Sequence, residues 1–316
     1  MKNEDRIKVF SGGSNHDLFS EICRYLNVPE GKIMMTTFAD GEIYCRIEES
    51  VRGRDTFIIQ PTCSPANENL MKLLIIIDAL KRASAGSITA VVPYFGYARQ
   101  EKKATGREPI TAKLVANLIT TAGANRVVTM DMHDPALQGF FDIPVDHLSA
   151  IQILASHLLK RDLHNYVVVS PDTGGVHRAR AFAKRLELPL AIMDKRRPEP
   201  NKAVIMNVIG EVSGKNVFII DDMIDTAGTM VQVAQALLER GVKKITACCT
   251  HPVLSDPASE RIMSSSITEI IATDSLYTVE RKKKLPILET LSVAPLIGET
   301  IQRIFDKRSV SELFIR

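Results

Sequence analysis

The sequence has no apolar run long enough to cross a membrane, because its most apolar segment, Leu70 to Leu80, contains Lys72 and Asp78. It also has little excess charge, with 40 lysines and arginines against 37 aspartates and glutamates. This near balance argues against nucleic acid or a membrane surface as the main partner. Tryptophan is absent, and this absence excludes nothing.

Cysteine is scarce. The odd number and the lack of any C-x-x-C pair favour reduced core residues of a cytosolic protein. The charged N-terminus, Met1 to Arg6, runs directly into Ile7 to Phe10 and leaves no room for the apolar region of a signal peptide. We therefore expect a cytoplasmic protein. The cysteines are Cys23, Cys45, Cys63, Cys248 and Cys249.

Short apolar runs alternate with longer helical patterns along the chain. Apolar runs at 7–10, 32–37, 56–60 and 88–92 flank helical patterns that begin near Asp17 and Asn67. This alternation predicts βαβ units and a parallel sheet. Since the chain has 316 residues, it is longer than one typical domain, and we expect two domains.

An internal repeat supports the two-domain prediction. The helical pattern at 111–123 has the length and apolar rhythm of the pattern at 229–241, at an offset of 118 residues, and a strand pattern follows each. Chance periodicity shared by any two α/β halves is the alternative. We predict two copies of one α/β domain, at 1–147 and 148–316. The C-terminal tail from about residue 304 is a candidate segment for packing on the first domain.

The stretch Val217 to Met230 is the most informative part of the sequence. Its apolar start predicts a buried strand, and the small and hydroxyl residues of Asp225 to Thr229 run into an amphipathic helix. Backbone N–H groups and the helix dipole then converge on one spot, which suits a phosphate. Asp221 and Asp222, at the expected strand end, suit sugar hydroxyls or magnesium. An ordinary strand-turn-helix with solvated acids is the alternative.

Other polar segments are weaker candidates. Tyr97 to Pro109 is basic and suits a mobile loop over polyphosphate, although a solvated surface loop is as consistent with its composition. The cations of Asp194 to Pro198 could neutralise charge during phosphoryl transfer. His133 and Asp172 follow predicted strands, at the edge where parallel sheets bind ligands. Phe38 to Glu42 predicts a tight turn.

The Val217 to Met230 segment resembles the loop of the type I phosphoribosyltransferase fold that binds 5-phosphoribosyl-1-diphosphate (PRPP). The chain as a whole resembles the ribose-phosphate pyrophosphokinase family almost end to end. This resemblance implies two tandem, duplicated α/β domains of phosphoribosyltransferase type, and transfer of the diphosphoryl group of ATP to the 1-hydroxyl of ribose 5-phosphate. The products would be PRPP and AMP, for nucleotide biosynthesis. The matching stretches include 38–42, 69–83, 93–100, 107–110, 131–133, 138–146, 170–172, 194–198 and 309–314.

The resemblance also implies a role for individual residues. Lys195 is the expected catalytic cation, and magnesium is expected at His133 and Asp172. The ATP residues are Asp40, Gly41, Glu42, Arg99 and Gln100. The ribose 5-phosphate residues are Arg197, Asp221, Asp222, Asp225, Thr226, Ala227, Gly228 and Thr229. Family members are typically homohexamers regulated by ADP and phosphate, for which 309–314 and 46–54 are candidate segments.

Some positions depart from the family pattern, namely Thr173, His177 and Ala104 to Gly106, and they leave loop kinetics and regulation open. A salvage phosphoribosyltransferase that consumes PRPP is an alternative function, although it would not need the duplicated half. A non-catalytic regulatory subunit is another, although the intact Lys195 and Arg197 argue against it.

Overall fold

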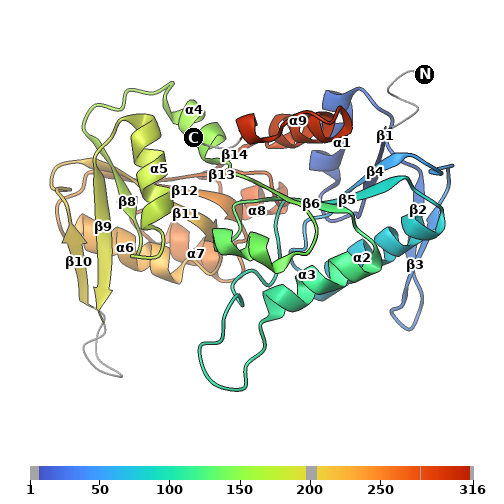
Figure 1. Ribbon diagram of the computed structural model, residues 1–316. Coiled ribbons are helices and arrows are strands. Elements are labelled where there is room, and N and C mark those ends of the chain that lie inside the picture. The colour runs from blue at the N-terminus through green and yellow to red at the C-terminus, as the bar shows by residue number, and fades with distance from the viewer. Residues whose placement is uncertain (1–6, 197–204, 278, 314–316) are drawn as a thin grey trace. The chain divides into compact units, whose positions relative to one another are not determined.

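A computed structural model describes residues 7–196, 205–277 and 279–313, which divide into two compact units (Figure 1). The first unit spans residues up to 149, together with 275–277 and the chain from 292 onward; the second spans 150–274 and 278–291. Each unit contains a mainly parallel sheet flanked by helices, which confirms the predicted fold class. Among the described residues, no helix has the length and hydropathy that a membrane span needs.

The described part of the first unit is built on a sheet of five parallel strands in the order β1-β4-β5-β6-β7. The antiparallel hairpin β2-β3 forms a separate small sheet. The elements of this unit are β1 (Ile7–Ser11), α1 (His16–Leu26), β2 (Ile33–Thr37), β3 (Ile43–Ile47), β4 (Asp55–Ile59), α2 (Ala66–Arg82), β5 (Ser87–Val92), α3 (Thr111–Ala122), β6 (Arg126–Met130), the 3₁₀ helix η2 (Pro135–Phe140), β7 (Val145–Leu148), α9 (Ala294–Phe305) and the 3₁₀ helix η3 (Ser311–Leu313).

Both faces of this sheet are buried. Ile58 and Ala90 pack in one core cluster with α2 and α3, whereas their strand neighbours Phe57 and Val91 are buried on the other face. Figure 1 shows α2 and α3 on one side of the sheet and α1 and α9 on the other. Burial on both faces explains why the strands appear in the sequence as continuous apolar runs.

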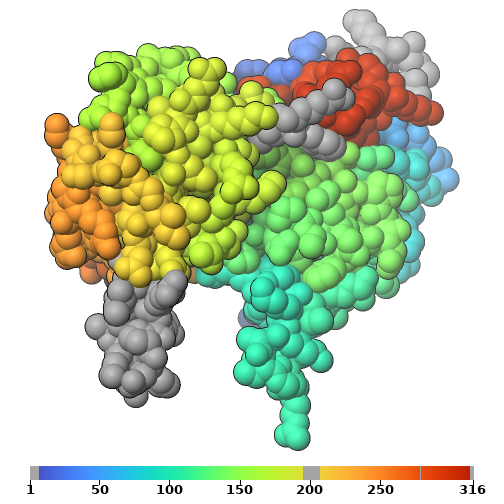
Figure 2. Space-filling view, turned by 60° about the vertical axis from the view of Figure 1, so that its left-hand side comes forward, coloured from blue at the N-terminus to red at the C-terminus, as the bar shows by residue number. Residues whose placement is uncertain are grey.

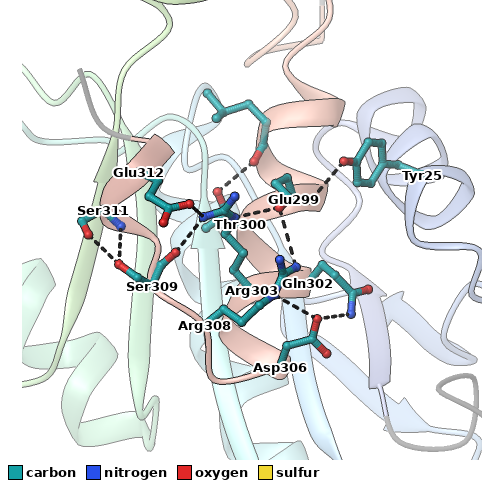
Figure 3. A network of polar contacts seen from close by, with 11 residues as sticks. Tyr25, Glu299, Thr300, Gln302, Arg303, Asp306, Arg308, Ser309, Ser311 and Glu312 are labelled. Carbon is teal, nitrogen blue, oxygen red and sulfur yellow. Dashed lines mark hydrogen bonds and ion pairs between the residues drawn. The ribbon is translucent and has the colours of Figure 1, made fainter. Parts of the chain in front are cut away.

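The last helix of the chain packs on the first one. Tyr25 of α1 donates a hydrogen bond to the carboxylate of Glu299 of α9 at 3.2 Å, across 274 residues of sequence (Figure 3). The ring of Tyr25 also lies against Gly298, where an added Cβ would overlap it. The returning segment begins at residue 292, earlier than the residue near 304 expected from the sequence.

Arg303 ties the C-terminal tail to α9. Its Nε donates to Glu299 at 2.7 Å, and its Nη1 donates to the carbonyl of Ser309 at 2.9 Å and to the carboxylate of Glu312 at 2.6 Å (Figure 3). One guanidinium therefore holds the helix and the following 3₁₀ turn together, using the forked donors that arginine provides.

The second unit has a larger sheet, with the order β10-β9-β8-β11-β12-β13-β14 within its described residues. All neighbouring strands are parallel except the β10-β9 pair. The elements are α4 (Ile151–Leu158), β8 (Tyr166–Ser170), α5 (Val176–Leu186), β9 (Leu190–Arg196), β10 (Ile205–Ile209), β11 (Asn216–Ile224), α6 (Gly228–Leu238), β12 (Lys244–Pro252), α7 (Ala258–Met263), β13 (Glu269–Thr273), α8 (Val279–Lys284) and β14 (Leu288–Leu291).

The chain reverses its direction across the second sheet between β8 and β11. From β8 it passes through α5 to β9 on one side, and from β11 it passes through α6 to β12 on the other. Ile219 packs in a core cluster with Val233 of α6, whereas Phe182 of α5 is buried outside that cluster. Figure 1 shows α5 and α6 on opposite sides of the sheet. Open parallel sheets bind ligands at the carboxyl ends of strands that flank such a switch point.

The predicted duplication is visible in the two units. β4, β5, β6 and β7 lie side by side and parallel in the first unit, as β8, β11, β12 and β13 do in the second. β6 begins at Arg126 and β12 at Lys244, which preserves the offset of 118 residues. The helix before each of these two strands is followed by a glycine with positive φ, Gly123 after α3 and Gly241 after α6. None of the cysteines in the described chain forms a disulfide, and all except the half-buried Cys45 are buried, as expected.

Candidate active site

The strand that carries the acid pair is longer than the sequence predicted. β11 extends to Ile224, so Asp221 and Asp222 lie within the strand and not at its end. The reason is unequal pairing, because β11 pairs with β8 only as far as Ile219 but with β12 as far as Ile224. The acids therefore lie on the part of β11 that extends past its β8 neighbour, beside the switch point.

Arg178 of α5 bridges the two acids. Its Nη1 lies 3.1 Å from Oδ1 of Asp221 and 3.4 Å from Oδ1 of Asp222. The Asp222 side chain is only 3% exposed and the Asp221 side chain is 26% exposed, so Asp221 is the carboxylate that a ligand can reach. The less exposed Asp222 and Arg178 set its charge environment.

The protonation of Asp221 depends on these neighbours. Burial raises its pKa well above the ordinary value, the adjacent Asp222 raises the pKa further, and Arg178 opposes both effects. The acid pair therefore holds a proton more tightly than an exposed aspartate does. Ligand hydroxyls that donate hydrogen bonds to Asp221 would favour its ionised form.

A short loop, residues 225–227, connects the acid strand to α6. Ala227 adopts the left-handed conformation, with φ 59° and ψ 5°, and among the described residues no side chain caps the start of α6. The first N–H groups of a helix lack partners within the helix, and a left-handed residue beside them helps to form an anion-binding concavity. Thr226 and Thr229 are exposed and add hydroxyl donors. The loop therefore has the form expected of a phosphate cradle.

Asp172 lies in the turn that connects β8 to α5. Its Oδ1 accepts a hydrogen bond from the N–H of Gly175 at 2.8 Å, and its backbone carbonyl accepts one from the Ser170 hydroxyl at 2.8 Å. Asp172 remains exposed. An oriented, accessible carboxylate suits magnesium, which usually takes one or two carboxylates together with substrate phosphates.

The other predicted metal residue, His133, belongs to the first unit, where it is exposed after the end of β6. Imidazole nitrogen is a less typical magnesium ligand than oxygen. Within the described ranges, no group of three or more histidine, cysteine, aspartate or glutamate side chains could hold a metal ion. The donor chemistry therefore fits magnesium better at Asp172 than at His133.

Asp40, Gly41 and Glu42 form the exposed turn of the β2-β3 hairpin. Phe38 donates its N–H to the carbonyl of Glu42 at 2.8 Å, and Oδ1 of Asp40 accepts the N–H of Glu42 at 3.1 Å. Gly41 has a φ of 93°, a conformation that glycine adopts readily. The predicted tight turn is therefore confirmed, and it presents both carboxylates to solvent.

Arg99 and Gln100 lie at the start of the long segment between β5 and α3, and both are exposed. Figure 2 shows this segment, in teal, projecting from the body of the first unit. The carboxylate of Glu108 accepts the N–H of Thr105 at 3.0 Å, the hydroxyl of Thr105 at 2.8 Å and the N–H of Ala104 at 2.7 Å, and these hydrogen bonds lower the pKa of Glu108. The projecting tip is thus closed on itself by one carboxylate.

The remaining predicted residues are described only in part. The backbone of Lys195 lies on β9 opposite Met206 of β10, but the Lys195 side chain is outside the described part of the chain. Arg197 lies outside the described residues.

Comparison with known proteins identifies the family. Residues 7–123 match the model of the N-terminal domain of ribose phosphate pyrophosphokinase, and residues 195–315 match the phosphoribosyl synthetase-associated domain. The ribose-phosphate pyrophosphokinase of Bacillus caldolyticus is 56% identical over 98% of both chains. That of Corynebacterium ammoniagenes is 55% identical over 98% of this chain and 97% of its own. The chain belongs to the ribose-phosphate pyrophosphokinase family.

A solved structure supports the assignment. The phosphoribosylpyrophosphate synthetase of Mycobacterium smegmatis is 43% identical, with a TM-score of 0.91 over 96% of this chain and 99% of that one. This ribose-phosphate pyrophosphokinase family member is thus a transferase whose full length matches its relatives.

The family's predicted site residues fall on both units. In the second unit the structure gathers Asp221, Asp222, Asp172 and the 225–229 loop around the switch point of the sheet. The predicted nucleotide residues lie in the first unit on two different loops, the β2-β3 turn and the β5-α3 segment.

Arg178 is a residue of the candidate site that sequence reasoning missed. It lies 43 residues from Asp221 in the sequence, and their contact depends on α5 packing beside β11. The sequence carried only an indirect signal, namely a cation in the first turn of the helix that follows Asp172.

Proposed function

We propose that this chain transfers the diphosphoryl group of ATP to the 1-hydroxyl of ribose 5-phosphate, giving PRPP and AMP for nucleotide biosynthesis. The observation that carries the proposal is a coincidence at one sheet edge. An accessible carboxylate, Asp221, lies beside the left-handed loop at the start of α6, in a chain whose full-length relatives are ribose-phosphate pyrophosphokinases.

The second unit is the proposed sugar-phosphate site. The N–H groups and hydroxyls of residues 225–229 hold the 5-phosphate, since helix N-termini favour anions. Asp221 accepts hydrogen bonds from the ribose hydroxyls, and buried Asp222 and Arg178 keep its carboxylate in place. These contacts orient the 1-hydroxyl for attack on the β-phosphorus of ATP, with AMP as the leaving group.

Charge stabilisation is assigned to the cationic residues. Lys195 is the proposed catalytic residue and acts on the diphosphoryl group during transfer, while Arg197 contributes to ribose 5-phosphate binding. Asp172 and His133 are the proposed magnesium residues, and a bound magnesium ion would neutralise charge on the polyphosphate oxygens.

The first unit is the proposed nucleotide-binding part. ATP is assigned to Asp40, Gly41 and Glu42 in the hairpin turn and to Arg99 and Gln100 in the β5-α3 segment. We propose the ATP loop and the regulatory surface for the domain predicted at 1–147, with which the chain from 292 onward packs. We propose the ribose 5-phosphate site for the second unit, within the predicted range 148–316. Under these assignments ATP binds in the first domain and ribose 5-phosphate binds in the second.

The decisive assay mixes the purified protein with ATP, magnesium and ribose 5-phosphate, and quantifies AMP and PRPP by chromatography. Equal amounts of AMP and PRPP support the proposal, and the absence of PRPP overturns it. In a second reaction the protein receives PRPP and a purine base. Release of pyrophosphate with consumption of the base would instead support a salvage phosphoribosyltransferase.

We further propose a cytoplasmic homohexamer with ADP and phosphate as regulators, because the family resemblance implies this assembly. By the same resemblance, a neighbouring subunit completes the nucleotide site, so ATP binding should require the oligomer. Light scattering during size-exclusion chromatography, combined with ATP titration of each fraction, tests this requirement. A fully monomeric fraction that binds ATP normally would contradict it.

A further inference from the structure

Arg261 contacts the loop that forms the proposed phosphate cradle. It lies on α7, and its Nη1 donates a hydrogen bond to the backbone carbonyl of Thr226 at 3.0 Å. The same nitrogen lies 3.8 Å from the position that a Cβ on Gly228 would take. The guanidinium therefore lies along the loop at two successive points, although 35 residues of sequence separate it from Thr226.

The contact fixes the orientation of one peptide group. Because a peptide bond is planar and trans, the N–H of Ala227 points away from the carbonyl of Thr226. That carbonyl is directed at Arg261, so the N–H of Ala227 is directed to the opposite side of the loop. Ala227 is the left-handed residue that immediately precedes α6, so this N–H adjoins the first N–H groups of the helix.

Left-handed geometry at an alanine needs such support. A residue with a Cβ adopts this conformation at some energetic cost, and such strain persists only where the surroundings hold it. Without the hydrogen bond from Arg261, the peptide between Thr226 and Ala227 could rotate and turn its carbonyl toward the anion. A carbonyl in that position would repel a phosphate that the N–H attracts.

We propose that Arg261 is a positioning residue of the phosphate cradle, which holds the Ala227 N–H toward the 5-phosphate of the sugar substrate. This inference rests on the proposed function, since it assumes that the 225–229 loop binds a sugar phosphate. Arg261 acts through the loop backbone, and its positive charge also favours a dianion nearby.

A purely structural role for Arg261 predicts a different result. The residue is exposed, and one hydrogen bond from an exposed side chain contributes little to the stability of the fold. Its loss should therefore leave the thermal unfolding temperature unchanged. The effect should appear in the binding of the phosphorylated sugar and not in that of ATP.

The experiment compares Arg261→Ala and Arg261→Lys with the control Arg185→Ala, which removes an exposed arginine from the last turn of α5. For Arg261→Ala we expect the KM for ribose 5-phosphate to rise about tenfold, because a hydrogen bond from a charged donor is lost. We expect kcat and the KM for ATP to change less than about twofold. Arg261→Lys should recover part of the loss, as should added guanidinium with Arg261→Ala.

Three outcomes would overturn the inference: an unchanged KM for ribose 5-phosphate in Arg261→Ala, an equal rise in Arg185→Ala, or a fall in kcat with both KM values altered alike. Calorimetric titration of ribose 5-phosphate without ATP checks that the KM reports binding. A wild-type enzyme that forms no PRPP would refute the proposed function itself. If the wild type forms PRPP and the Arg261→Ala variant has an unchanged KM for ribose 5-phosphate, only the proposed role of Arg261 is refuted.

Discussion

The segments 93–110 and 225–227 occupy the same place in the repeated fold, between a central strand and the helix that follows it, yet they differ greatly in length. The short one connects β11 directly to α6 and is the proposed phosphate cradle. The long one projects from its unit and carries exposed charged side chains. Loops of more than about 15 residues are uncommon in compact domains and are often functional. The same position of the repeated fold thus holds a short connection in one unit and a projecting loop in the other.

The two sheets also differ at the edge formed by the carboxyl ends of their strands. In the first unit the strand order follows the chain order from β1 to β7, whereas the second unit reverses between β8 and β11. Near the end of β4, buried Gln60 donates to the carbonyl and the side-chain oxygen of Asn69 at 3.1 and 3.2 Å, and accepts the Ser14 hydroxyl at 3.0 Å. These polar groups satisfy one another within the protein, whereas Asp221 remains accessible. This difference supports the proposal that the sugar site belongs to the second unit.

The largest expected effect concerns Lys195. A cation that acts on the moving diphosphoryl group stabilises the transition state more than the bound substrates. Lys195→Ala should therefore lower kcat by on the order of 100-fold or more, with a small change in KM. Arg197→Ala should also raise the KM for ribose 5-phosphate. Steady-state kinetics beside Lys243→Ala, an exposed control in the same unit, would test this. A near-normal kcat with only a raised KM in Lys195→Ala would show a binding role.

The acid pair is the next test of the asymmetry between the units. Asp221→Ala and Asp222→Ala should each raise the KM for ribose 5-phosphate, by roughly tenfold or more, because charged acceptors for the sugar hydroxyls are lost or displaced. Asp142→Ala, which removes an exposed acid from the first unit, should not. Circular dichroism checks that the fold is intact. Unchanged ribose 5-phosphate kinetics in both variants would remove the acids from the site.

The long loop should affect the other substrate. Replacing residues 101–106 with two glycines, which keeps Arg99 and Gln100, should lower kcat/KM for ATP by on the order of tenfold, since a closing loop commits the bound nucleotide. Ribose 5-phosphate binding, measured by calorimetry, should stay unchanged. A loss of ribose 5-phosphate affinity in this variant would contradict the division of labour between the two loops.

A smaller effect is expected in the pH dependence of stability. The pKa of Asp221 is raised in the folded protein, so the folded state binds this proton more tightly than the unfolded state. Its contribution to stability is fully present below the ordinary aspartate pKa of about 4 and is lost as pH rises through the raised pKa. Asp221→Asn should flatten this decline. Unfolding temperatures of the wild type and of Asp221→Asn, measured across the pH range without ligand, test this expectation. If stability falls equally with pH in the two proteins, the pKa of Asp221 is not raised.

A change at the α1-α9 contact of the first unit should lower stability and have the smallest effect on catalysis. Gly298→Ala should destabilise that unit by about 1–2 kcal/mol, because the new methyl group overlaps the Tyr25 ring. Denaturant unfolding measures the loss. The KM for ribose 5-phosphate should be unaffected, and the double variant with Tyr25→Ala should recover part of the stability. A fully stable Gly298→Ala protein would show that the ring moves aside at no cost.

Much of the fold could be predicted because the sheets are buried on both faces. The strand expected at 88–92 is β5 at Ser87–Val92, and the helix expected from Asp17 is α1 from His16. Periodicity reports burial directly, but it does not report which neighbour a strand pairs with. The extension of β11 past β8 was missed for that reason.

The candidate site could be predicted from the sequence where its residues are consecutive, and not where they meet through packing. The 225–229 loop and the acid pair lie within a single stretch of sequence, and family resemblance supplied their roles. Arg178 and Arg261 reach that stretch from α5 and α7, and no spacing in the sequence records such contacts. The early start of the returning C-terminal segment was missed for the same reason.

The return of α9 to α1 has a consequence for synthesis on the ribosome. The chain is made from its N-terminus, and domains generally fold as they emerge. All strands of the second sheet, β8 to β14, precede α9 in the sequence, whereas α1 awaits a partner whose contact residue lies 274 positions downstream. Since contacts so distant in sequence form slowly, the first unit to emerge is the last to be completed. Until then the α9-facing surface of α1 remains open, and a nascent chain that stops before residue 292 leaves it uncovered.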